Sequence, residues 1–225
     1  MITTRPIRVL LLASSFATVG AFAANPIDEI ASHDGLTKVE VKGLDLAYAR
    51  KDTNFAGYGK LIVEPVEVAF HKNWNPTRPG SHLKLGAGDR ENIRTGVAKI
   101  VQEEFERALQ PTYPLAKEAG PDVLRVRAKV LNLIANAPDT KTAGAHAIVM
   151  SSGEMTLLLE LYDSETGSIL ARVVDRKEGR NTGQWQMASS VASAGDAKAV
   201  AASWAKVLRN GLDKAHGTLK TKDKK

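Results

Sequence analysis

Residues 123–134 read Val-Leu-Arg-Val-Arg-Ala-Lys-Val-Leu-Asn-Leu-Ile, and this alternation of apolar and basic side chains decides the fold class. Successive side chains of a β-strand point to opposite faces of the sheet, so a period of two predicts a strand with one buried and one solvated face. The buried face would carry Leu124, Val126, Ala128 and Val130, and the solvated face would carry Arg125, Arg127 and Lys129.

Three more strands are predicted around this one. The run at residues 60–70 is rich in branched side chains and precedes a polar loop, which is typical of a strand. Pro65 within it cannot donate to a ladder, so it indicates a sheet edge or a bulge at that point. A third strand alternates over 155–161, and a short polar turn with a glycine leads from it into a fourth strand at 168–176.

Two amphipathic helices complete the predicted fold. Asp89 can cap a helix over residues 89–110, whose apolar side chains recur every three or four positions. Ser193 resembles the start of a capping box for a last helix with an apolar stripe that ends near Gly217. The predicted order is therefore β-α-β-β-β-α. It describes a single α/β (α+β) domain, with a four-stranded mixed sheet and both helices packed on one face.

The first 23 residues have the features of a secretory signal. Arg5 and Arg8 precede an apolar run at 9–17, and residues 21–23, Ala-Phe-Ala, offer the small side chains that a signal peptidase reads. An uncleaved membrane anchor is the alternative, but the apolar segment is short for a bilayer and polar residues interrupt it. We therefore expect export with removal of residues 1–23.

The chain contains no cysteine, which excludes disulfides, thiolate metal sites and the cysteine-linked anchor of bacterial lipoproteins. The expected product is a periplasmic protein with no transmembrane segment after signal cleavage. Residues 24–217 should form one domain, with an N-terminal segment at 24–59 packed along a core at 60–217, and 218–225 should be a disordered lysine-rich tail. Much of the net charge of +6 lies in the signal and the tail, so we expect no nucleic-acid partner.

The predicted strand directions bring three long connections to one end of the sheet. The first two strands run parallel through a helical crossover, and the last two form an antiparallel hairpin. Connections 71–88, 136–153 and 179–192 then share one rim, where both helices also begin, and function concentrates on such loops. The candidate recognition residues of the rim are His71, Trp74, Arg78, His82, His146, Arg180 and Trp185. Alternatively, the two tryptophans fold back over the core and the histidines are dispersed solvated residues.

Several motifs together resemble the bacterial domain of unknown function 3313 family (DUF 3313). They are Tyr-Ala-Arg from Tyr48, Phe-Ala-Gly-Tyr-Gly-Lys-Leu-Ile-Val-Glu-Pro-Val-Glu-Val from Phe55, Asp-Ser-Glu-Thr-Gly-Ser-Ile-Leu-Ala-Arg-Val-Val-Asp-Arg from Asp163, Trp-Ala from Trp204 and Gly-Leu-Asp from Gly211. The resemblance covers roughly residues 36–215. It implies an exported bacterial envelope protein without an established activity, and it supplies no catalytic residue.

The sequence contains no recognisable catalytic constellation. No glycine-flanked serine accompanies the histidines, and the spacing of His71, His82 and His146 is wide and irregular for a zinc site. We therefore predict no catalytic residue, cofactor or metal. The expected function is a non-enzymatic binding or envelope-assembly module, with an envelope protein or envelope polymer as its partner. Two alternatives stay open, a hydrolase that acts on an envelope polymer and a purely structural envelope factor.

Overall fold

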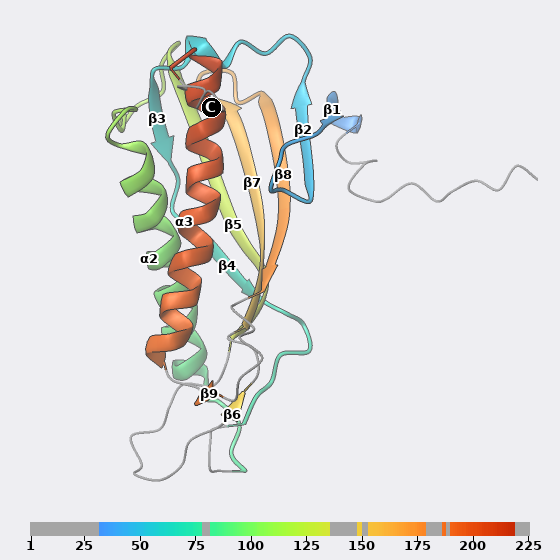
Figure 1. Ribbon diagram of the computed structural model, residues 1–225, viewed down its shortest axis with the longest axis vertical. Helices are drawn as coiled ribbons and strands as arrows, with labels where there is room; N and C mark the ends of the chain where they lie inside the picture. Colours follow the sequence, from blue (N-terminus) through green and yellow to red (C-terminus); the bar gives the residue numbers. More distant parts are fainter. Residues whose placement is uncertain are drawn as a thin grey trace, which may run out of the picture.

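A computed structural model of the chain describes residues 32–77, 82–135, 148–149, 153–178, 186–187 and 190–218. It has an α+β architecture with two helices, a seven-stranded mixed sheet and a separate two-stranded sheet (Figure 1). The elements are β1 Leu36–Val39, β2 Leu46–Arg50, η1 Phe55–Gly57, β3 Lys60–Val63, β4 Glu67–Phe70, α2 Ala87–Leu109, β5 Val123–Ala135, β6 Ile148–Val149, β7 Gly153–Asp163, β8 Ile169–Glu178, β9 Gln186–Met187 and α3 Ser190–Ala215.

Strand β5, the alternating stretch, lies inside the sheet and sets the direction of its neighbours. It pairs parallel with β3 and β4 on one side and antiparallel with β7 on the other. Strand β7 pairs antiparallel with β8. These directions are the ones that the sequence predicted for its four strands, since a helical crossover leaves the strands that it joins parallel.

Pro65 divides the first predicted strand in two. Residues on either side of it form β3 and β4, which both pair with β5 at the edge of the sheet. The outer side of β3 is covered by the segment after α2, because the Leu61 amide donates to the Pro114 carbonyl (3.0 Å) and the Leu61 carbonyl accepts from the Ala116 amide (2.8 Å). Strand β3 is nevertheless the last strand of the sheet on this side, so the edge position, one of the two alternatives that the proline indicated, is confirmed.

The prediction of four strands was wrong, because the N-terminal segment also enters the sheet. Strands β1 and β2 form an antiparallel pair, and β2 extends the sheet beyond β8 to give the order β1-β2-β8-β7-β5-β3, with β4 also on β5. The element order therefore departs from β-α-β-β-β-α. Reciprocal hydrogen bonds fix this junction: the Asp45 amide donates to the Asp175 carboxylate (3.0 Å), and the Arg176 amide donates to the Asp45 carboxylate (2.8 Å).

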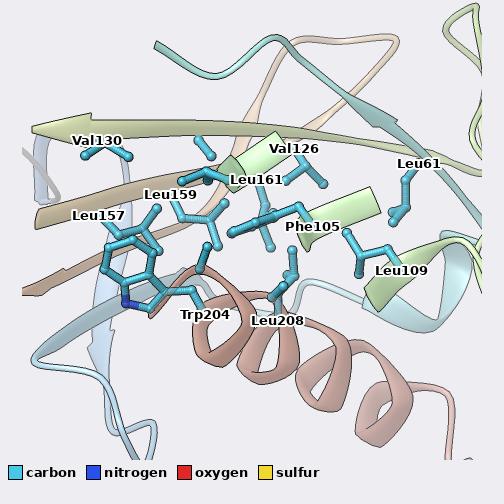
Figure 2. Packing of buried hydrophobic residues seen from close by; sticks show 14 of the residues in the cluster. Leu61, Phe105, Leu109, Val126, Val130, Leu157, Leu159, Leu161, Trp204 and Leu208 are labelled. Carbon is cyan, nitrogen blue, oxygen red and sulfur yellow. The ribbon is translucent and has the colours of Figure 1, made fainter. Parts of the chain in front are cut away.

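Both helices pack on the face of the sheet that carries the apolar side chains of β5 (Figures 1 and 2). Leu124, Val126, Ala128 and Val130 are each at most 1% exposed, as their alternation predicted. The helices contribute Phe105 and Trp204, among others, to the same cluster. Burying such side chains contributes about 1.5–3 kcal/mol each, so this single layer of contacts is the main source of stability.

A bulge near the end of β5 reverses which of its side chains face the helices. The pairing with β7 shifts register between Leu131 and Ile134, and the pairing with β4 shifts at the same level. Asn132 has a φ of 52°. In a regular strand Val130 and Leu133 would point to opposite faces because they are three residues apart, but both side chains are buried. The extra residue thus re-aims the last part of the strand, as bulges do.

The helix boundaries differ slightly from those predicted. Helix α2 begins two residues before Asp89, whose carboxylate reaches back to the Gly86 amide (3.0 Å) as the acid of a capping box. Helix α3 begins at Ser190, and Gly217 follows its end with a φ of 68°, which suits glycine. Thr218, predicted to start the disordered tail, instead donates its amide to the Asp213 carbonyl (2.9 Å). Within the described ranges, neither helix combines the length and apolar character required to cross a membrane.

Candidate binding rim at one end of the sheet

Three connections leave the same end of the large sheet. Phe70, the last residue of β4, pairs with Leu133, and Ala135, the last residue of β5, pairs with Gly153 at the start of β7. Strand β8 runs antiparallel to β7, so it ends at the end of the sheet where β7 begins. We call the connections at 71–86, 136–152 and 179–189 the rim. Helices α2 and α3 both begin at this end of the sheet (Figure 1).

Two of the rim connections are joined to each other. Strand β6 belongs to the connection between β5 and β7, and β9 belongs to the connection between β8 and α3. They pair antiparallel, with Ile148 opposite Met187 and Val149 opposite Gln186. The convergence that strand directions predicted for these two connections is therefore present in the backbone.

The remaining connection, between β4 and α2, is closed at its base. Thr77 and Lys84 form an antiparallel bridge, and the Leu85 amide donates to the Pro76 carbonyl (3.2 Å). The Lys84 ammonium donates to the Asn75 carbonyl (3.1 Å). These contacts hold the two described ends of the connection together and lead the chain to the start of α2.

Trp74 anchors this loop to the sheet. Its side chain is 8% exposed, and its indole N–H donates to the carbonyl of Ala135 at the end of β5 (2.8 Å). Its ring stacks on Phe70, with 4.3 Å between centroids and an angle of 4° between planes, and the Arg90 guanidinium lies 5.5 Å from the ring centroid. For Trp74, these contacts favour the alternative that it covers the core.

Of the other predicted rim residues, the structure describes His71 and His82. His71 is half-buried at the end of β4, and its amide donates to the Leu133 carbonyl (3.0 Å). His82 is exposed in the segment that leads to α2. Arg78, His146, Arg180 and Trp185 lie outside the described residues. Of the described rim predictions, His82 is thus the one whose side chain is exposed.

Leu83 is an exposed rim residue that was not predicted. Its side chain is 67% exposed, the highest value among the exposed large apolar residues that the structure describes. It lies between His82 and Lys84 in a loop of polar character, and a lone apolar residue in such a loop is the signal that could have identified it.

One carboxylate of β7 lies near a rim histidine. The Arg176 guanidinium donates to both oxygens of Glu154 (2.7 and 2.6 Å). These hydrogen bonds, followed by the charges of Arg176 and His71, lower the pKa of Glu154 despite its burial. A general acid requires a raised pKa, so Glu154 is held as a fixed negative charge. Among the described residues, no cluster of three or more histidine and acidic side chains has a metal-binding arrangement.

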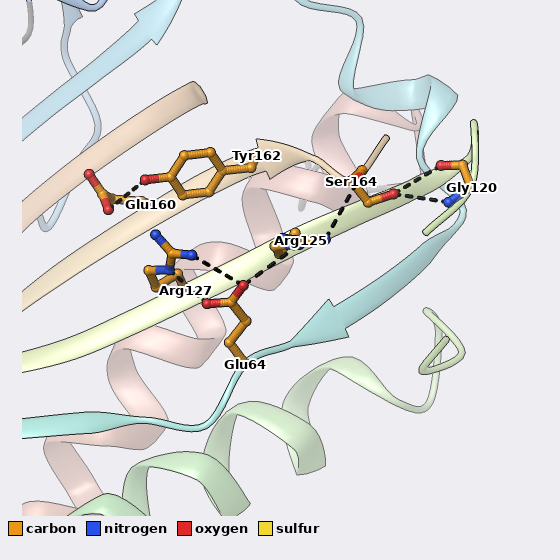
Figure 3. A network of polar contacts seen from close by, with 7 residues as sticks. All are labelled: Glu64, Gly120, Arg125, Arg127, Glu160, Tyr162 and Ser164. Atoms are coloured by element: carbon orange, nitrogen blue, oxygen red, sulfur yellow. Dashed lines mark hydrogen bonds and ion pairs between the residues drawn. The ribbon is translucent and has the colours of Figure 1, made fainter. Parts of the chain in front are cut away.

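The helix-free face of the sheet carries a second polar network (Figure 3). Glu64 accepts two hydrogen bonds from the Arg127 guanidinium (2.6 and 3.3 Å) and forms an ion pair with Arg125 (3.6 Å). Arg127 also lies 5.0 Å from the ring centroid of Tyr162. The face predicted to be solvated is therefore polar, with its arginines tied to a carboxylate from the β3–β4 junction.

The acidic residues of this face are held by arginine side chains. Arg172 bridges Glu160 and Asp34, each at 2.7 Å, and the Tyr162 hydroxyl donates to Glu160 (2.8 Å). Burial and then this hydrogen bond raise the pKa of Tyr162 to about 12. Glu64 and Glu160 each pair with a guanidinium from a neighbouring strand, so the arrangement serves cross-strand cohesion.

The aspartates of the resemblance motifs bind aromatic side chains from distant segments. Asp163 accepts the Tyr58 hydroxyl (2.9 Å), and Asp213 accepts the Tyr113 hydroxyl (2.8 Å). Burial, followed by the hydrogen bond to Asp163, raises the pKa of Tyr58 to about 12. These motif residues join elements of the fold and assemble no reacting groups.

Comparison with solved structures finds distant likenesses. The PelC dodecamer from Paraburkholderia phytofirmans is 8% identical over 76% of this chain and 96% of that chain, with a TM-score of 0.35. A DUF330 protein from Xanthomonas campestris is 12% identical over 70% and 88%, with a TM-score of 0.35. A candidate lipoprotein from Caulobacter crescentus is 11% identical over 74% and 98%, with a TM-score of 0.36. Such TM-scores are too low to support a functional inference.

No curated protein matches this chain. The sequence profile of the family described as "Protein of unknown function (DUF3313)" matches residues 27–208. That range includes every strand of the large sheet and most of α3, so the match extends over the fold and not over one motif. The chain therefore belongs to the DUF3313 family.

Proposed function

We propose that this chain is a non-enzymatic binding or envelope-assembly protein of the periplasm, and that the rim is its recognition surface. The observation that carries the proposal is the convergence of the three connections on one end of a rigid sheet, with β6 and β9 joining two of them. Loops held by a rigid scaffold are where binding residues concentrate. The partner would be an envelope protein or an envelope polymer.

Leu83 gives the proposal an accessible apolar contact. An exposed apolar side chain flanked by polar groups is typical of an interaction surface, whereas a buried anchor such as Trp74 is not available to a partner. His82 beside it and, outside the described residues, Trp185 are the other rim side chains that we expect to contact the partner. Trp74 would instead keep the loop in place.

Site-specific crosslinking tests the rim. A chain with a photo-crosslinker at position 83 should become linked to a defined envelope protein or to isolated peptidoglycan, with which it would then sediment. Trp185→Ala should reduce the yield of the crosslinked product severalfold. A crosslinker at Leu115, which is 37% exposed near the opposite end of the sheet, is the matched control. Equal capture from positions 83 and 115 would contradict the rim as the recognition surface.

The hydrolase alternative makes a different prediction for the same preparation. Incubation of the purified chain with isolated envelope polymers should release no soluble fragments if the rim only binds. Release that is lost in His71→Ala or His82→Ala would instead support the hydrolase. A purely structural factor would leave position 83 without a specific crosslink.

Export is the second part of the proposal. Removal of residues 1–23 should give a mature periplasmic chain that begins at Ala24, because Ala21 and Ala23 are the small residues that a signal peptidase reads. Intact-mass measurement on periplasmic protein checks this start. Recovery of the full-length chain from the membrane fraction would support the anchor alternative.

A further inference from the structure

The β1–β2 hairpin is joined to the rest of the large sheet along a single short ladder. Strand β2 pairs with β8 over residues 46–49, whereas β7 pairs with β8 from Glu154 to Tyr162. Strand β1 pairs with β2 and ends the strand order. A two-stranded hairpin is marginally stable by itself, so its place in the fold depends on its contacts at β8.

The buried apolar side chains of the hairpin form a cluster of their own. Leu36 and Tyr48 pack with Ile169 at the start of β8. Among the described residues, the main cluster, which joins the sheet to α2 and α3, contains none from 36–50. Detachment of the hairpin would therefore break the small cluster and leave the main cluster intact.

The side that β2 turns toward the helices carries small side chains. Ala47 and Ala49 lie opposite Val173 and Ala171 of β8, and opposite residues of an antiparallel pair share a face. Ala171 belongs to the main cluster and Val173 packs against it, so the two alanines lie on the helix side. Each contributes only a methyl group, so β2 adds little apolar burial there.

Polar groups hold the hairpin near both of its ends. Asp34, which precedes β1, pairs with Arg172 (2.7 Å). Asp45, which precedes β2, exchanges hydrogen bonds with the Asp175 carboxylate and the Arg176 amide, as described above. Water replaces such partners when they separate, so the net gain from each bond is small. Asp175 is 0% exposed, and on opening its charge would gain hydration in place of the Asp45 amide.

We propose that the β1–β2 hairpin is a detachable cover of β8. Residues 34–50 open as one unit while β5, β7, β8 and both helices stay folded, as locally stable units of other folds do. Opening leaves β8 as an edge strand, whose unpaired backbone groups can accept a strand of another chain. The cover lies outside the rim, and its opening does not depend on the function proposed for the rim.

Thiol labelling of the folded mature chain detects this opening. The chain contains no cysteine, so a single introduced one is the only thiol that reacts. Ala47→Cys reports on β2 and Ala128→Cys on β5, and the two alanines are 4% and 1% exposed. Each labelling rate is divided by the rate of the same variant in concentrated urea. The resulting ratio should be at least tenfold higher at position 47 than at position 128.

Second substitutions separate opening of the hairpin from global unfolding. Asp45→Ala removes the carboxylate that accepts the Arg176 amide and should speed labelling at position 47 severalfold. Lys42→Ala, an exposed change in the same connection, is the matched control and should leave that rate unchanged. Leu109→Ala, in the main cluster, should speed labelling at position 128 at least tenfold. It should not affect position 47, because the opened hairpin state keeps the contacts of Leu109.

Three results would overturn the proposal. Equal ratios at positions 47 and 128 would mean that the hairpin opens only when the whole fold unfolds. Acceleration of both positions by Leu109→Ala to the same extent would have the same meaning. Fast labelling at position 47 that Asp45→Ala does not change would show that the reagent reaches β2 without detachment of the hairpin.

Discussion

Trp204 of α3 donates its indole N–H to a carboxylate oxygen of Asp175 in β8 across 2.6 Å, and neither side chain is more than 2% exposed. Asp175 also accepts the Asp45 amide and forms an ion pair with Lys177 (2.9 Å). The aspartate thus lies on the helix side of the sheet and joins α3, β8 and the residue that precedes β2. A buried carboxylate at this junction is tolerable because the Trp204 indole, the Asp45 amide and the Lys177 ammonium all donate to it.

Removal of Trp204 should be among the most destabilising single changes. Trp204→Ala should cost about 3–5 kcal/mol in the free energy of unfolding, because it leaves a cavity below α3. Trp204→Phe keeps most of the packing and should cost about 1–3 kcal/mol through the lost bond to a charged acceptor. Urea unfolding measures both. Lys206→Ala, on the exposed side of the same helix, should change the stability little.

Trp74→Ala should destabilise the fold rather than act only on binding. The indole is buried, stacks on Phe70 and donates to the Ala135 carbonyl, so its truncation should cost about 3 kcal/mol or more. His82→Ala, an exposed change in the same connection, should leave the unfolding midpoint nearly unchanged. Equal unfolding midpoints for Trp74→Ala and the wild type would show that the indole does not contribute to the stability of the fold.

The bulge of β5 should tolerate glycine better than a branched residue. Asn132 has a φ of 52°, where a non-glycine residue costs about 1–2 kcal/mol and a β-branched one is the least suited. Asn132→Val should therefore lower the unfolding free energy by at least about 1 kcal/mol, whereas Asn132→Gly should be neutral or slightly stabilising. Asn210→Val on the exposed side of α3 provides the control, and a similar loss there would contradict a conformational cause.

Two carboxylates should make the fold sensitive to acid. Hydrogen bonds from Thr166 and, less strongly, from Tyr58 lower the pKa of Asp163, and hydrogen bonds from Arg176 lower that of Glu154. A lowered pKa in the folded state gives stability that is present above the unfolded value of about 4 and is lost as the pH falls through the folded value. Asp163→Asn should lower the stability at pH 7 and flatten its decline below pH 4 in urea titrations. An unchanged slope would contradict this linkage.

The central part of the fold could be predicted from the sequence because it is encoded locally. The alternation at Leu124, Val126, Ala128 and Val130 fixes which face of β5 is buried, and Pro65 marks the edge. Strand β2 is different, because its place is set by pairing with β8, more than a hundred residues away. Short alternations such as those of β1 and β2 carry no information about their neighbour, so the sheet was predicted with too few strands.

The candidate site was predictable in its location and not in its side chains. Strand directions follow from connection lengths, and they placed the rim where the three connections converge. Whether an aromatic side chain in a loop covers the core or faces solvent depends on tertiary contacts. Trp74 meets the Ala135 carbonyl and the Phe70 ring, two groups that its own sequence neighbourhood does not specify together.

The pairing of β6 with β9 has a consequence for the entropy of the rim connections. Two free loops lose conformational entropy when a ligand orders them, at roughly 1–2 kcal/mol per residue for the backbone alone. Here part of that loss already occurs on folding, because Ile148 and Val149 are held against Met187 and Gln186 before any partner arrives. If the rim binds a partner as proposed, that partner would meet a partly preorganised surface and would lose less of its binding free energy to the ordering of loops.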